Sequence, residues 1–145
     1  MDYTILKNEI TNDPLGRGYA SMSDAQVAAS LNTVDRTVPD STRYTMRRVM
    51  EVMTDAGAAI TKLDQVTDPL VVEAMRALRS YTEGGGLDFS HPKTIGMIDQ
   101  LTSQGVLTSQ EASELKSIGT KPASRAEELG LERVEVGHVT SARAM

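Results

Sequence analysis

The stretch Met46-Arg-Arg-Val-Met-Glu-Val-Met-Thr-Asp-Ala-Gly-Ala-Ala-Ile-Thr-Lys-Leu63 carries the clearest structural signal in the chain. Its apolar residues recur at helical intervals, which places them along one face of an α-helix. These residues are Met46, Val49, Met50, Met53, Ala56, Ile60 and Leu63. The spacing predicts one long helix over residues 46–63, with Gly57 as a point where the helix can bend.

Helix start and stop signals stand on both sides of this stretch. Polar N-cap residues precede several apolar periodic segments, and glycines follow some of them. The start signals are Asp2, Ser23, Asp68-Pro69, Ser90-His91-Pro92, Thr108 and Ser124, and the stop signals are Gly105, Gly119 and Gly130. The sequence therefore predicts an all-α, mostly helical fold, in which residues 32–40 form a connector.

Two segments depart from this helical pattern. Val134 and Val136 alternate with charged residues, which is compatible with one short C-terminal β segment before a last helix over 139–143. Gly84-Gly85-Gly86 interrupts the chain, and three glycines in succession make a flexible joint. The sequence therefore predicts an N-terminal helical lobe over 1–83, a Gly-rich linker over 84–89, and a C-terminal helical hairpin and tail over 90–145.

Composition excludes several classes of function. The chain has 145 residues, no cysteine and two histidines, so disulfides, thiolate zinc sites and histidine-rich metal sites are excluded. The glycine-containing loop Leu15–Tyr19 has neither the Lys-Ser/Thr pair of a Walker loop nor a preceding strand. No apolar run approaches the length of a membrane span. We therefore expect a protein that is not an enzyme, takes no cofactor or metal, and has no membrane partner.

The densest cluster of basic residues is Arg43, Arg47 and Arg48. Arg43 and Arg47 lie one turn apart on the expected helix, so they share a face. The expected hairpin over 94–118 raises a helix-turn-helix alternative, but its second helix carries more acidic than basic residues. The net charge of −5 argues against nucleic acid as a partner. The arginines are better explained as a solvated face or as a contact for an acidic partner.

Both ends of the chain resemble a known family. The N-terminal part of the resemblance includes Leu6-Lys-Asn-Glu-Ile10, Thr11-Asn-Asp-Pro-Leu-Gly-Arg-Gly-Tyr-Ala20 and Leu31-Asn-Thr-Val-Asp-Arg36. The C-terminal part includes Ser124-Arg-Ala-Glu-Glu-Leu-Gly-Leu131 and Val134-Glu-Val-Gly-His-Val139. Together they resemble a family of small tailed-bacteriophage proteins of unassigned function, often encoded in virion morphogenesis modules. The resemblance covers about the first 36 and the last 25 residues, and the middle departs from the family pattern.

The resemblance implies a structural or assembly component of a tailed-phage virion, in the tail or the head–tail region. Its partners would be other virion proteins and further copies of itself, in the particle and, during assembly, in the host cytoplasm. Two alternatives stay open: a cytoplasmic accessory protein that inhibits a host factor, and a helical DNA-binding regulator.

Two segments are candidate contact surfaces. Methionine side chains adapt to irregular partners, and an extended valine segment can add a strand to a neighbouring sheet. The first surface consists of Met46, Val49, Met50 and Met53 with Arg43 and Arg47, and the second of Val134, Val136, Val139 and Arg143.

Overall fold

A computed structural model describes all residues, 1–145, and divides the chain into two compact units. The terminal unit combines Met1–Val38 with Pro122–Met145, and the inserted unit consists of Pro39–Lys121. The chain leaves the terminal unit through β1 (Val34–Pro39) and returns through β4 (Thr120–Ser124), and these two strands pair with each other. The inserted unit therefore interrupts the terminal unit in the sequence.

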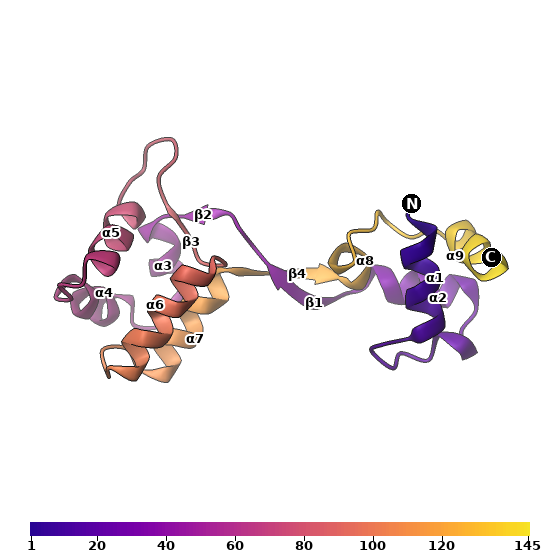
Figure 1. Ribbon diagram of the computed structural model, residues 1–145, viewed down its shortest axis with the longest axis horizontal. Coiled ribbons are helices and arrows are strands. Elements are labelled where there is room, and N and C mark those ends of the chain that lie inside the picture. The colour runs from indigo at the N-terminus through magenta and orange to yellow at the C-terminus, as the bar shows by residue number, and fades with distance from the viewer. The chain divides into compact units, whose positions relative to one another are not determined.

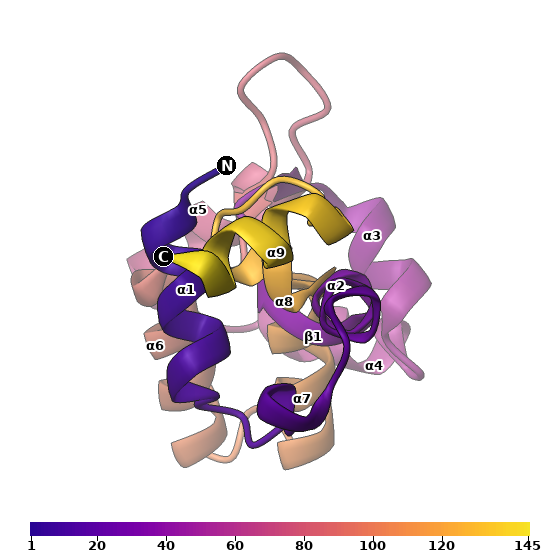
Figure 2. The same cartoon turned by 90° about the vertical axis from the view of Figure 1, so that its right-hand side faces the viewer.

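The terminal unit is built from helices contributed by both ends of the chain. Figure 2 shows α1, α2, α8 and α9 grouped together, and α9 packs against both α1 and α2. The elements are α1 (Tyr3–Asn12), a 3₁₀ turn η1 (Tyr19–Ser21), α2 (Asp24–Asn32), α8 (Arg125–Glu128) and α9 (Val136–Ala144). The expected caps are confirmed, because Asp2 accepts hydrogen bonds from Thr4 and Ile5 and both Ser23 and Ser124 form capping boxes.

Polar contacts in the terminal unit join residues far apart in the sequence. The Asn32 amide accepts from the Val134 N–H at 3.0 Å and donates to the Val134 carbonyl oxygen at 2.7 Å. Arg125 lies against Glu9, which is buried, and also against Glu128, which pairs with Arg36. The apolar core of this unit likewise takes residues from both ends of the chain: Leu6, Ile10, Tyr19, Val27, Leu31, Leu131, Val134 and Val139.

The inserted unit contains five helices, which Figure 1 shows grouped together, and has its own apolar core. Its elements are β2 (Arg43–Tyr44), α3 (Met46–Val52), α4 (Ala56–Asp64), α5 (Pro69–Leu78), β3 (Leu87–Asp88), α6 (Pro92–Ser103) and α7 (Ser109–Ile118). β2 and β3 are antiparallel, with Arg43 opposite Asp88 and Tyr44 opposite Leu87. The first and last residues of the unit are close, since the Asp40 N–H donates to the Gly119 carbonyl oxygen at 2.7 Å.

The all-α prediction is wrong, because the chain forms two small two-stranded sheets besides its nine α-helices. The expected connector over 32–40 contains β1, whose β-branched Val34, Thr37 and Val38 favour extended backbone. The expected C-terminal β segment is absent: Val134 lies outside regular structure, and Val136 begins α9.

The predicted long helix over 46–63 is also wrong. Two helices occupy this stretch, and the chain turns at Met53, Thr54 and Asp55. Asp55 accepts a hydrogen bond from the Ala58 N–H at 3.2 Å and so caps α4, while the Thr54 hydroxyl donates to Glu114 of α7 at 2.6 Å. Met53 nevertheless stays in the core, so the apolar stripe continues across the break.

The compact units also differ from the predicted lobes, 1–83 and 90–145 with a linker over 84–89. Gly84–Gly86 belongs to the inserted unit, in a loop that projects between α5 and β3 (Figure 1). Gly84 and Gly86 adopt φ angles of 80° and 89°, where side chains are disfavoured, and the Gly86 N–H donates to the Ala77 carbonyl oxygen at 2.9 Å. The triplet closes a loop within one unit and does not separate two units.

Candidate contact site

The apolar residues of the first predicted contact surface fall into a buried and an exposed group in the structure. Met46, Val49 and Met53 are in the core of the inserted unit, with exposed fractions of 7%, 1% and 5%. Met50, on the same helix, is 62% exposed. The buried group stabilises the fold, and only Met50, at the edge of the buried stripe, is open to a partner.

The predicted C-terminal surface is mostly internal. Val134 and Val139 are fully buried in the terminal unit, and only Val136 is exposed. Arg143 donates to the carbonyl oxygens of Tyr19 and Met22 at 2.7 and 2.9 Å and also pairs with Asp24. These contacts tie α9 to the rest of the unit, so Val134, Val139 and Arg143 stabilise the fold.

The exposed side of α3 and the preceding strand β2 form what we call the arginine face: Arg43, Tyr44, Thr45, Arg47, Arg48, Met50 and Glu51. All of these residues except Met50 line a surface groove of about 490 Å³. Met50 lies one helical turn after Arg47, so the two side chains share the exposed side of the helix. Guanidinium groups and a methionine side chain are therefore presented together.

The charges on this face are unbalanced. Arg47 and Arg48 both approach Glu51, with N–O distances of 3.3 and 3.4 Å, and share its single carboxylate. Arg43 lies on β2 and not, as expected, on the same helix as Arg47. It forms no ion pair, and its Nη1 donates to the Gly84 carbonyl oxygen at 2.8 Å. The facing Asp88 is occupied with the N–H and hydroxyl of Ser90.

Tyr44, one of the residues of the arginine face, is held in place by a hydrogen bond. Its hydroxyl donates to the buried Asp40 carboxylate at 2.6 Å, and this hydrogen bond raises the pKa of Tyr44. Hydrogen bonds from Thr42 and Tyr44 lower the pKa of Asp40 to about 2. The Arg48 guanidinium carbon lies 5.5 Å from the centre of the Tyr44 ring, within the range of a cation–π interaction. The ring therefore provides a fixed support for one arginine.

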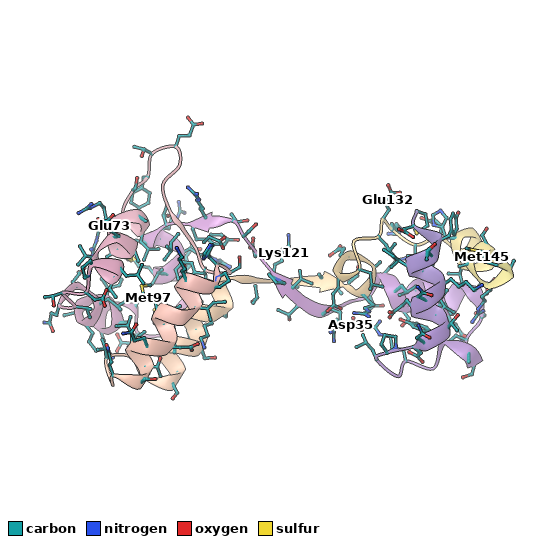
Figure 3. The ribbon with its side chains drawn as sticks, viewed as in Figure 1. Asp35, Glu73, Met97, Lys121, Glu132 and Met145 are labelled. Carbon is teal, nitrogen blue, oxygen red and sulfur yellow. The ribbon has the colours of Figure 1, made fainter.

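A second groove lies on the inserted unit, between α5, β3 and α6. Figure 3 labels Glu73 and Met97, which line it from α5 and α6. Its volume is about 360 Å³, and its lining is mainly apolar, with half-exposed Leu70 at one side and Lys93 among the polar residues. Ala74, Leu87 and Met97 also line a cavity of about 30 Å³ in the core beneath the groove. The sequence periodicity of α5 accounts for its buried side but did not indicate this groove.

The helical hairpin of α6 and α7, considered above as a DNA-reading motif, uses its charged residues within the unit. Glu111 of α7 pairs with Lys62 of α4, and Glu114 accepts from Thr54. Lys116 pairs with Asp99 of α6. These contacts direct much of the charge on α7 toward neighbouring helices.

Both histidines act at helix N-termini. The His91 Nδ1 accepts from the Lys93 N–H at 3.1 Å and caps α6, and the His138 Nδ1 accepts from the Glu135 N–H at 3.0 Å at the start of α9. No group of three or more His, Asp or Glu side chains is arranged to hold a metal ion. No helix has both the length and the apolar character needed to cross a bilayer.

Comparisons with protein-family models, with curated proteins and with solved structures found no match to this chain.

Proposed function

We propose that this protein is a structural or assembly component of a tailed-phage virion, in the tail or the head–tail region, and acts through protein–protein contacts. The observation that carries the proposal from the structure is the arginine face, where Arg43, Arg47 and Met50 are presented together on the surface. Mixed cationic and apolar surfaces of this kind suit protein partners, since arginine and methionine are both enriched at interfaces.

The family resemblance at the two ends of the chain supplies the virion context. The first 36 and the last 25 residues, which carry the resemblance, belong to the terminal unit except for Lys121. The segment that departs from the family pattern corresponds largely to the inserted unit, which carries the arginine face. We therefore propose that the terminal unit serves the shared role and that the inserted unit adds a contact particular to this chain.

Deleting the gene from the phage that encodes the chain tests the proposed function. We expect lysates with heads or tails that fail to join or mature, visible by electron microscopy, and recovery of normal particles when the wild-type gene is supplied in trans. Normal particles and normal titre after deletion would count against a virion role and favour the host-factor inhibitor.

A further inference from the structure

We infer that the arginine face binds a short acidic segment of a partner protein, whose carboxylates pair with Arg43 and Arg47 and whose apolar side chain packs on Met50. The inference rests on the proposed function, because it names the chemistry of the partner that a contact protein of this kind would take.

The first argument is charge complementarity. Three guanidinium groups and one carboxylate line the groove, and Arg43 has no carboxylate partner. The ion pairs of Arg47 and Arg48 with Glu51 are long and solvent-exposed, so they hold these arginines weakly. A carboxylate of a partner can therefore bind Arg47 in place of the weak contact with Glu51. The guanidinium offers that carboxylate two parallel N–H donors.

The second argument is that contacts within the protein already fix side chains of the arginine face before a partner binds. Asp40 fixes Tyr44, Tyr44 supports Arg48, and the Gly84 carbonyl oxygen orients Arg43. Side chains held in place before binding lose less conformational entropy when a partner docks. The face therefore presents Arg43 and Arg48 in defined positions and leaves exposed Arg47 free to adjust beside them, which favours carboxylates of one docked segment over a diffuse counter-ion cloud.

The third argument distinguishes an acidic protein segment from nucleic acid. The chain carries a net charge of −5, which repels a long polyanion whose phosphates extend beyond the arginine face. A short acidic segment places its charges only where the arginines are. Met50, 62% exposed beside Arg47, also offers apolar contact that a phosphate backbone does not use.

Titration of the full-length ¹⁵N-labelled chain, followed by amide chemical shifts, tests the inference. The probe is N-acetylated, C-amidated hexaglutamate at about 50 mM ionic strength, where screening of exposed charges is modest. We expect saturable shifts concentrated in residues 43–51. Arg47→Gln should weaken binding about two- to fivefold, and the double variant Arg43→Gln/Arg47→Gln about tenfold, the scale of one or two exposed charge pairs.

Arg76→Gln is the matched control. Arg76 lies on α5 of the same unit, is exposed, and pairs with exposed Glu73, but it is not part of the arginine face. Its binding should equal that of the wild type, and the unperturbed shifts of each variant show that the fold is kept. A peptide that combines alternating Glu and Leu should bind the wild type more tightly than hexaglutamate and lose that advantage in Met50→Ala.

Three results would overturn the inference: shifts scattered outside 43–51, equal binding by wild type and the double variant, or no saturable binding at all. Tighter binding of an oligothymidylate of equal charge, lost in Arg47→Gln, would replace it with a nucleic-acid site. The titration uses the isolated chain, so a negative result would contradict the acidic-segment inference without contradicting the virion role. Normal particles after gene deletion would contradict the virion role without changing the measured peptide binding.

Discussion

Arg125 forms a bidentate ion pair with Glu9, in which its Nε and Nη2 each lie 2.9 Å from a different carboxylate oxygen. The two residues are 116 positions apart in the sequence, and their contact joins α8 to α1. Glu9 is nearly inaccessible, and the Tyr19 hydroxyl also approaches its carboxylate, at 3.4 Å. This pair fastens the two ends of the chain into the terminal unit.

Replacing Arg125 should destabilise the terminal unit. Arg125→Gln leaves the buried Glu9 carboxylate without its cation, and we expect the free energy of unfolding of this unit to fall by about 3–5 kcal/mol. Hydrogen exchange of the α1 and α2 amides measures this unit separately from the inserted one. Arg133→Gln is the control, because Arg133 and its partner Glu135 are both exposed, and its effect should stay within about 0.5 kcal/mol. Equal effects of the two substitutions would contradict the fastening role.

Acid should weaken the same unit through Glu128. Hydrogen bonds from Arg36, and then from Arg125, lower the pKa of Glu128 from 4.5 to about 2. Because the folded pKa lies below the unfolded one, this group contributes stability above pH 4.5, and the contribution is lost as the pH falls toward 2. In wild type, denaturant midpoints of the terminal unit should fall over this range more than in Glu128→Gln. Parallel pH profiles for the two proteins would show that Glu128 has no such role.

Met46 and Met50, one turn apart on α3, should respond differently to the same substitution because one side chain is buried and the other is exposed. Met46→Ala removes a buried side chain and should lower the free energy of unfolding of the inserted unit by about 2–5 kcal/mol. Met50→Ala, one turn further along the helix, should change it by less than about 0.5 kcal/mol because that side chain is exposed. Chemical denaturation followed through the α3 amides measures both. A large loss for Met50→Ala would mean that Met50 packs inside the unit.

The glycine loop provides a test of how the units are composed. A protease that cleaves after glutamate should cut the free chain first at Glu83, since this residue is exposed in the projecting loop, outside any helix or strand (Figure 1). The fragments 1–83 and 84–145 should then co-elute in size-exclusion chromatography, because each unit contains residues from both fragments. They should separate only in denaturant. Two fragments that elute apart under native conditions would instead support independent lobes on either side of the loop.

Local signals in the sequence predicted the helix caps well. The capping boxes at Ser23, Thr108 and Ser124 are present in the structure, and Gly105 and Gly130 adopt positive φ angles at helix ends. Each of these features depends on residues within a few positions of one another, so the sequence contains all the information they need.

Local signals could not predict features that depend on residues far apart in the sequence. The break after Val52 is accompanied by hydrogen bonds from Thr54 to Glu114, and the pairing of β1 with β4 joins segments on opposite sides of the inserted unit. The pattern over 46–63 has helical periodicity on both sides of the break, so periodicity alone favours one helix. Asp55, a residue type favoured at N-caps, was the local signal that could have indicated the start of α4.

Only part of the candidate site could be predicted, because the rest depends on contacts between residues far apart in the sequence. Apolar spacing made Met46, Val49, Met50 and Met53 a candidate contact surface, but it did not show that the core buries the other three and leaves only Met50 exposed. The arginine cluster was visible in the sequence, whereas the roles of Gly84 and Asp40 in orienting it depend on folding. The valines of the C-terminal segment were misassigned, because Asn32 occupies the backbone groups of Val134 that strand addition requires.

Quantitative mass spectrometry of gradient-purified virions tests the virion role most directly. We expect the protein to be present at several copies per particle, at a constant ratio to the major capsid protein across the gradient peak, as repeated contacts around a symmetry axis require. A major capsid peptide serves as the internal standard, and an abundant host cytoplasmic protein reports contamination. Absence of the protein from clean virions, with abundant protein in the infected-cell cytoplasm, would contradict the virion role.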